Sequence, residues 1–287
     1  MTKRKTQTTA RESFDIRGYT VSEAQAWNFK VGRAANPKDV SFRLGDLVIG
    51  AGGPVFIAGP CAVEGEKSFL STVEALVESG IKLIRANLFK FRTLTTSFQG
   101  MGEKGIDLLA RAKEKFGVRL VTEVTEIGQI KLLAPVVDVF QVGSRSMMNT
   151  SLLKALGRLD HPVLFKRGFS ATLGEYLAAA EYIAQGGNLK IILCERGIRT
   201  FEPWLRFTLD IPGIALLRKV SPLPVIADIS HGLGRTDIAL PMARAALAAG
   251  AAGLMVEVHS SPKRAKSDAR QQMTPGEFVR LLKNLAP

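Results

Sequence analysis

The chain has 287 residues, enough to bury a sizeable core as one large domain or two small ones. Hydrophobic residues make up 46% of the chain and charged residues 23%, a globular composition that excludes the disordered and fibrous classes. The formal net charge of +13 suits anionic ligands. Nucleic acid is not expected as a partner, because we find no zinc-finger spacing, no recognition-helix pattern and no basic helix interleaved with aromatic residues.

The first part of the chain is irregular and polar. Residues 1–45 are predicted to form a tail and a small hairpin, with its turn at residues 44–46, that closes the bottom of a barrel. This stretch is too short for a full regulatory domain, so we expect none here. The barrel itself is assigned to residues 46–287.

Two further features of the sequence bear on membrane association and on the redox compartment of the protein. The sequence contains no apolar run of about 18 residues, so we expect no transmembrane helix and no membrane partner. Cys61 and Cys194 end different predicted strands that are far apart in sequence. This placement argues against a disulfide framework and favours a reducing cytoplasm.

From residue 54 onward, short apolar strands alternate with amphipathic helices, for example at 103–116 and 173–185. The predicted strands are residues 55–60, 82–86, 119–124, 138–143, 162–168, 190–197, 224–230 and 253–259. They are near-continuous apolar runs, as expected for strands that are covered on both faces. Eight such units predict an α/β fold, a closed (β/α)8 TIM barrel, and an open doubly wound sheet is the alternative.

In such a barrel, chemistry takes place at the carboxyl ends of the strands and in the loops that follow them. Cations gather at these positions, most densely on the loop after the strand at 82–86. The set comprises Arg85, Lys90, Arg92, Arg145, Lys166 and Arg196. Six cations around one mouth would repel one another, so the sequence predicts a polyanionic, phosphorylated substrate.

A second set of polar residues combines a thiol, an imidazole and two carboxylates. It comprises Cys61, His231, Glu257 and Asp268, which follow the first, seventh and eighth strands. Because the first and eighth strands of a closed barrel are neighbours, we expect these side chains to be adjacent in space. Their chemistry suits a borderline divalent metal ion such as Mn, Fe, Co or Zn.

Seven motifs, in this order, resemble those of a known enzyme family. They are GPCAVE (59–64), KFRT with SFQG (90–100), GSR (143–145), FKRG (165–168), CERGIRTFE (194–202), SHGLGR (230–235) and VEVH followed by SD (256–268). The chain resembles 3-deoxy-D-arabino-heptulosonate 7-phosphate (DAHP) synthases from about residue 46 to about residue 280. The resemblance is closest to the short bacterial type I-beta branch, which is related to 3-deoxy-D-manno-octulosonate 8-phosphate (KDO8P) synthase.

The resemblance implies an enzyme that condenses phosphoenolpyruvate with an aldose phosphate, classically erythrose 4-phosphate, in the first step of the shikimate pathway. It implies that Cys61, His231, Glu257 and Asp268 bind the divalent metal cofactor, that Arg85, Lys90, Arg145, Lys166 and Arg196 bind phosphoenolpyruvate, and that Arg92 and Thr93 bind the sugar phosphate. Among these residues, Lys90, Cys61 and His231 are the expected catalytic groups, with Lys90 able to transfer a proton. We further expect a homo-oligomer, a dimer or a tetramer.

The loop at the acceptor end departs from the family pattern, which is roughly RGGAFKPRTSPYSFQG. The family's proline before Arg92 is Phe91 here, and its Ser-Pro-Tyr is replaced by residues 94–96, Leu-Thr-Thr. Loss of the proline loosens the loop, and Phe91 and Leu94 add apolar bulk beside the sugar phosphate.

These departures leave alternatives open. The acceptor can be another aldose phosphate, as in a specialised-metabolite pathway. KDO8P synthase activity is less favoured, because KFRT with SFQG and the SHGLGR loop follow the heptulosonate pattern. An alternative of another class is a catalytically silent barrel that binds phosphorylated ligands, although such a protein would not need all four metal-binding residues.

Overall fold

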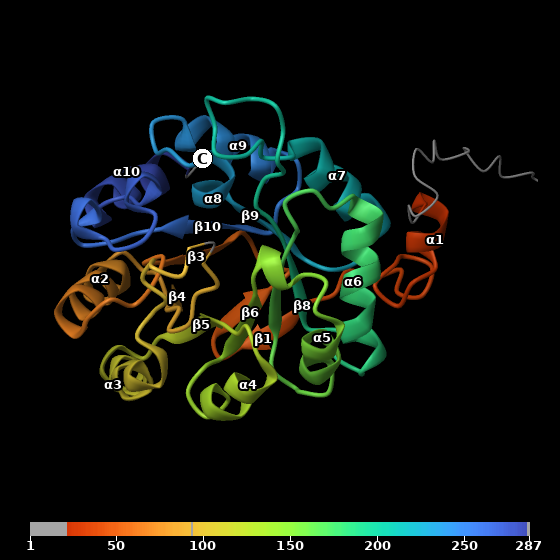
Figure 1. The fold of residues 1–287 in the computed structure, drawn as a ribbon. Coiled ribbons are helices and arrows are strands. Elements are labelled where there is room, and N and C mark those ends of the chain that lie inside the picture. The colour runs from red at the N-terminus through yellow and green to blue at the C-terminus, as the bar shows by residue number, and fades with distance from the viewer. Residues whose placement is uncertain (1–21, 93, 286–287) are drawn as a thin grey trace, which may run out of the picture.

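Eight parallel strands close into a barrel in the computed structural model, which describes residues 22–92 and 94–285 (Figure 1). The strands are β3 (Val55–Gly59), β4 (Leu83–Arg85), β5 (Arg119–Glu123), β6 (Val139–Val142), β7 (Val163–Lys166), β8 (Ile191–Glu195), β9 (Val225–Asp228) and β10 (Gly253–Glu257). Strand β10 pairs in parallel with both β9 and β3, which closes the barrel. The predicted TIM barrel is confirmed, and the open sheet is excluded.

Side chains along each strand alternate between the barrel interior and the surrounding helices. Buried residues from all eight strands form an inner apolar layer: Ile57, Leu83, Val121, Val139, Leu164, Ile192, Cys194, Ile226 and Met255. Their chain neighbours, such as Ala58 and Ile84, belong to the larger apolar cluster between strands and helices. Burial on both faces explains why the strands are continuous apolar runs in the sequence.

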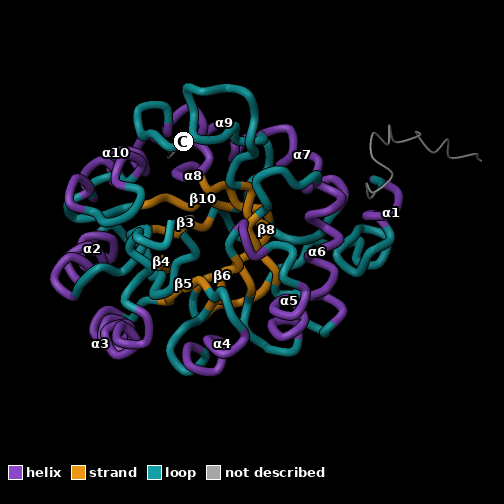
Figure 2. Tube along the Cα trace, viewed as in Figure 1, coloured by secondary structure: helices purple, strands orange, loops and turns teal. Residues whose placement is uncertain are grey.

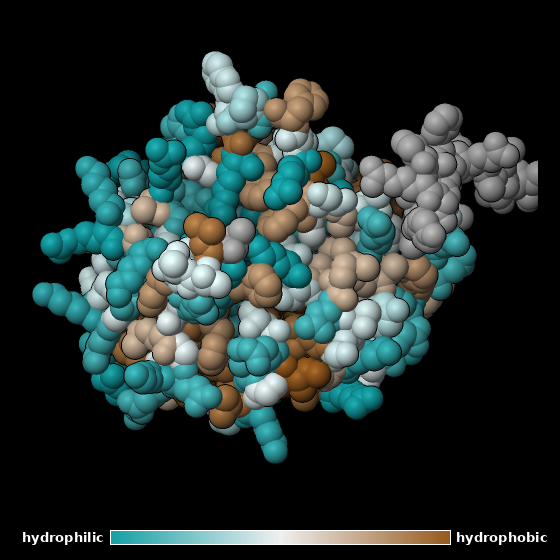
Figure 3. All heavy atoms as spheres, viewed as in Figure 1, coloured by the Kyte–Doolittle hydropathy of each residue, from teal (hydrophilic) through white to brown (hydrophobic). Residues whose placement is uncertain are grey.

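The helices lie around the strands, most of them in an outer ring (Figure 2). They are α1 (Glu23–Trp27), α2 (Glu66–Glu78), α3 (Ile106–Phe116), α4 (Ile127–Leu133), α5 (Thr150–Gly157), α6 (Leu173–Gln185), α7 (Ile211–Val220), α8 (Ile229–Leu233), α9 (Ala239–Ala248) and α10 (Pro275–Leu285). Hydrophilic residues dominate the rim of the face in Figure 3, as expected of helices whose outer sides are solvated. Within the described residues, no helix is long and apolar enough to cross a bilayer.

Several predicted boundaries differ from the observed ones by up to three residues. The strand predicted at 224–230 ends at Asp228, because the Asp228 carboxylate caps α8 and accepts a hydrogen bond from the His231 amide at 2.9 Å. The helix predicted at 103–116 starts with a 3-10 turn, and its α-helical part begins only at Ile106. The first correction matters for the site, since it places His231 on a helical turn directly above β9.

The predicted hairpin forms from β1 (Phe42–Leu44) and β2 (Leu47–Ile49), which pair antiparallel. Leu44 and Ile49 are buried and pack against the inner apolar layer, together with Val55 at the start of β3. The hairpin therefore covers the amino ends of the strands, and the polar loops lie at the opposite end.

We expect Ile49→Ala to lower the free energy of unfolding by about 2–5 kcal/mol, because Ile49 is only 2% exposed and fills the bottom of the inner layer. Ile49→Val should cost about 0.5–1.5 kcal/mol. Urea denaturation measures both values. Equal stability of the alanine variant and the wild type would show that the hairpin does not seal the barrel.

Candidate active site

A polar cavity of about 270 Å³ opens at the carboxyl ends of the strands. Its lining includes eight arginine and lysine side chains but only the carboxylates of Glu123 and Asp268. All six cations of the predicted set are among them: Arg85, Lys90, Arg92, Arg145, Lys166 and Arg196. The remaining two, Arg199 and Arg206, were not predicted; they lie on the long loop after β8, where no regular pattern marks them. Thr93 lies outside the described residues.

The strand ends determine where the cations lie. Arg85 is the last residue of β4 and Lys166 is the last residue of β7, so both rise from the barrel wall. Arg145 lies in a 3-10 turn directly after β6, and Arg196 directly follows β8. The barrel thus collects at one end side chains that are more than a hundred residues apart.

Two of the cations are neutralised within the protein, which corrects the picture of six mutually repelling charges. The guanidinium of Arg85 contacts the carboxylate of Glu257, and both side chains are buried. The Nζ of Lys166 lies 2.6 Å from Oδ2 of buried Asp228. Burial alone would raise the pKa of Asp228, but the charges of His231 and Lys166 hold it well below its usual value. The cavity keeps an excess of positive charge from its other cations.

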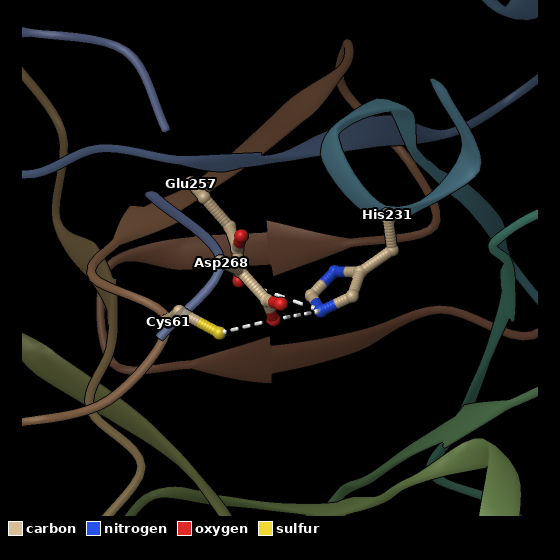
Figure 4. A group of neighbouring side chains, drawn as sticks. All are labelled: Cys61, His231, Glu257 and Asp268. Carbon is tan, nitrogen blue, oxygen red and sulfur yellow. Dashed lines mark hydrogen bonds and ion pairs between the residues drawn. The ribbon is translucent and has the colours of Figure 1, made fainter. Parts of the chain in front are cut away.

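Beside this cavity, Cys61, His231, Glu257 and Asp268 point toward one another (Figure 4). One candidate ligand atom from each lies within 4.8 Å of the other three. The Sγ of Cys61 is 2.9 Å from Oδ2 of Asp268, and Nε2 of His231 is 3.5 Å from Oε1 of Glu257. Pairing of Glu257 on β10 with Gly59 on β3 brings the end of the barrel next to its beginning.

The protonation states of these side chains fit a metal site. Burial lowers the pKa of His231 to about 4, so the imidazole is neutral at neutral pH and has a lone pair to offer. Burial alone would raise the pKa of Glu257, but His231, which is protonated at acid pH, and Arg85 bring it down to about 2. Burial raises the pKa of the Cys61 thiol to about 12, so a bound metal ion has to displace its proton. Thiolate, imidazole and carboxylates together suit a borderline divalent ion.

Asp268 has an unusual backbone. Its φ of 51° is the only positive value among the non-glycine residues that the structure describes. A left-handed conformation is unfavourable for a residue with a side chain, and such strain is concentrated at functional sites. Here it accompanies a carboxylate that lines the cavity and contacts Cys61 and Lys90.

Further side chains orient the four residues Cys61, His231, Glu257 and Asp268 through hydrogen bonds and ion pairs. Asp228 Oδ2 lies 2.8 Å from Nδ1 of His231, and Gln271 donates a hydrogen bond to Oε2 of Glu257 at 2.6 Å. Arg206 in turn contacts Gln271 at 2.6 Å and Asp268 at 3.2 Å. Such outer contacts fix the geometry of metal ligands. Gln271 and Arg206 carried no signal in the sequence, because Gln271 lies in a short 3-10 turn and Arg206 on the irregular loop after β8.

The departures at the acceptor end lie on the wall of the same cavity. Phe91 and Leu94 line it together with Arg92, and they are 53% and 65% exposed. Among the described residues, the guanidinium of Arg92 makes one long hydrogen bond, 3.5 Å, to the carbonyl of Phe98. Two exposed apolar side chains therefore flank the Arg92 guanidinium, which is held by one long hydrogen bond.

Comparisons with known proteins agree with this site. Residues 21–286 match the model of the DAHP synthetase I family. The phospho-2-dehydro-3-deoxyheptonate aldolase of Thermotoga maritima is 46% identical over 255 residues, which cover 89% of this chain and 75% of the relative. A 2-dehydro-3-deoxyphosphooctonate aldolase of Histophilus somni is 33% identical over 246 residues, 79% of this chain and 86% of the relative.

Solved structures give the same result. The crystal structure of the Thermotoga maritima DAHP synthase superposes with a TM-score of 0.87 at 45% identity, covering 90% of this chain and 76% of that one. A truncated form of that synthase gives a TM-score of 0.82 at 43% identity, over 89% of this chain and 94% of that one. The closed barrel, the motifs that end its strands and these matches show that the chain belongs to the DAHP synthetase I family.

Proposed function

We propose that this protein condenses phosphoenolpyruvate with an aldose phosphate, erythrose 4-phosphate in the simplest case, to give DAHP and inorganic phosphate in the first step of the shikimate pathway. The observation that carries the proposal is the meeting of two sets of side chains in one cavity. His231 and Asp268 of the four-residue metal group line the same cavity as the cations. A donor with a carboxylate and a phosphate and a polarised acceptor can thus be held side by side.

The cations divide into two groups in this proposal. Arg85, Lys90, Arg145, Lys166 and Arg196 hold the carboxylate and phosphate of phosphoenolpyruvate, and Arg92 with Thr93 holds the phosphate of the sugar. Arginine suits both tasks, because its planar guanidinium forms two parallel hydrogen bonds to carboxylate or phosphate oxygens. The donor's third carbon then bonds to the aldehyde carbon, water adds to the donor's second carbon, and phosphate leaves from the resulting tetrahedral carbon by cleavage of a C–O bond.

The metal-binding residues in this proposal are Cys61, His231, Glu257 and Asp268. A divalent ion held there, Mn, Fe, Co or Zn, supplies Lewis-acid polarisation of the acceptor aldehyde. Lys90 stands beside this group, with Nζ 2.5 Å from Cys61 Sγ and 3.8 Å from Asp268. From that position Lys90 can deliver a proton to the oxygen of the former aldehyde.

The acceptor is tested by measuring phosphate release with phosphoenolpyruvate, Mn²⁺ and a panel of aldose phosphates. Because Phe91 and Leu94 flank Arg92, the loop can favour another aldose phosphate. Restoring the family pattern with Phe91→Pro, Leu94→Ser, Thr95→Pro and Thr96→Tyr should then raise activity with erythrose 4-phosphate relative to the other acceptors. If the native protein already prefers erythrose 4-phosphate strongly over every other four- or five-carbon acceptor, the altered loop has not shifted specificity.

Other properties belong to the same proposal. The hairpin of β1 and β2 closes the bottom of the catalytic barrel, which begins at β3. The protein works in the cytoplasm as a homo-oligomer, a dimer or a tetramer, which light scattering after gel filtration tests. A silent barrel that only binds phosphorylated ligands is less favoured, because it has no use for the four metal-binding side chains.

A further inference from the structure

A pair of aromatic rings lines the cation-rich cavity. The rings of Phe169 and Phe207 stack with centroids 5.1 Å apart and planes 13° from parallel. The guanidinium carbon of Arg196 lies over both rings, 3.9 Å from the centroid of Phe207 and 4.9 Å from that of Phe169. Arg196 is only 2% exposed, so this contact is almost fully withdrawn from water. The carbonyl of Phe169 accepts a hydrogen bond from the Arg199 amide at 2.7 Å, which ties this ring to the loop after β8.

The charge of Arg196 is balanced differently from that of the other buried cations at the cavity. Arg85 contacts Glu257 and Lys166 contacts Asp228, each through a buried ion pair. Across residues 22–92 and 94–285, no carboxylate oxygen lies within 4.0 Å of the Arg196 guanidinium. Burial lowers the pKa of Arg196 to about 10, so it stays charged at neutral pH.

We propose that the ring pair of Phe169 and Phe207 keeps Arg196 charged without a counterion, and thereby positions it to bind an anionic group of phosphoenolpyruvate. The inference rests on the proposed function and adds Phe207 as a positioning residue. A ring face attracts a cation through its quadrupole, most strongly where water is excluded. Unlike a carboxylate, a ring does not cancel the charge or occupy the guanidinium N–H groups. Nη1 of Arg196 donates a hydrogen bond to the carbonyl of Gly197 at 3.2 Å, and the remaining N–H groups are left for a bidentate contact with the substrate.

The loop after β8 is built to bring Phe207 back to Arg196. Ile198 and Thr208 exchange two backbone hydrogen bonds of 2.9 and 3.0 Å, so the loop closes on itself just beyond the strand. Gly197 has a φ of 87°, and a Cβ on it would lie 2.7 Å from the Cβ of Phe207. Only glycine allows the ring this close to the strand end, and the loop therefore fixes the ring relative to the guanidinium.

The test replaces the ring face while keeping an apolar side chain. Phe207→Leu removes the aromatic ring face and Phe207→Tyr keeps it. Phe116→Leu is the matched control, because the ring of Phe116 also has a cation over it, Lys115 at 4.8 Å, but lies at the end of α3. Calorimetry gives the Kd of phosphoenolpyruvate on the metal-loaded proteins, and kinetics give kcat and the KM of each substrate. We expect Phe207→Leu to raise the Kd and KM for phosphoenolpyruvate about tenfold, with little change in kcat or in the acceptor KM. Phe207→Tyr should restore wild-type affinity, and Phe116→Leu should not alter it.

Three results would overturn the inference. The first is unchanged affinity in Phe207→Leu, and the second is an equal loss in the leucine and tyrosine variants, which would mean that shape and not the ring face matters. The third is an equal rise in both KM values together with a lower unfolding temperature, the signature of a general structural defect. If the wild type turns over no aldose phosphate at all, the proposed function fails. The ring pair is then judged by the binding of inorganic phosphate to the leucine and tyrosine variants.

Discussion

Cys61→Ala should abolish metal-dependent turnover, with a loss in kcat/KM of more than about a hundredfold. Removal of residues that merely orient metal ligands already costs about 10–100-fold, and Cys61 is one of only four donors in the group. The measurement is phosphate release before and after exhaustive chelation, with Mn²⁺ or Co²⁺ added back, alongside the metal content of each protein. The wild type should lose its activity on chelation and regain it with metal, whereas Cys61→Ala should regain none.

Cys194→Ala is the matched control, because Cys194 is the other free cysteine among the described residues and is equally buried, but lies outside the four-residue group. It should keep its metal content and its response to chelation. Full activity of the wild type after exhaustive chelation would show that the four residues do not form a catalytic metal site.

Lys166→Met should weaken catalysis with phosphoenolpyruvate by on the order of 2–5 kcal/mol in kcat/KM. The change removes a cation from the cavity while keeping the length of the side chain. It also leaves the carboxylate of Asp228 buried with His231 as its remaining close partner, so the negative charge there repels the donor. Steady-state kinetics with phosphoenolpyruvate as the varied substrate measure the loss.

Lys190→Met gives the comparison for this change. Lys190 also pairs with a carboxylate at 2.6 Å, that of Asp160, but the pair is exposed and lies away from the cavity. Exposed pairs contribute about 0–1 kcal/mol, so this variant should keep the kinetics of the wild type. Unchanged kinetics for phosphoenolpyruvate in Lys166→Met would remove Lys166 from the site.

The sequence predicted the strands and the closed barrel well, for a physical reason. Strands that are covered on both faces must be apolar throughout, and this local property survives without knowledge of the fold. Closure of eight such strands makes the first and last neighbours, which predicted that Cys61 and Glu257 would meet. The placement of the six cations followed from the same rule, because each lies at or after the carboxyl end of a strand.

The partners of individual side chains could not be predicted. The pairing of Lys166 with Asp228 depends on which groups face each other across a closed barrel, and a sequence of separate strands does not contain that information. The Phe169–Phe207 stack joins two loops that no periodic pattern describes. The predicted end of β9 was wrong because the side chain of Asp228 caps a helix. The apolar residues on both sides of Asp228 made the strand pattern continue beyond it in the sequence.

Closure of the barrel by β10 against β3 also determines when the proposed metal site can form. During synthesis Cys61 leaves the ribosome first, and its contact Asp268 follows 207 residues later. The growing polypeptide therefore cannot assemble the four donors until its last strand has been made and has paired. We therefore expect a divalent ion to bind only the finished barrel, where its affinity would protect the folded protein from unfolding without guiding the chain to its fold.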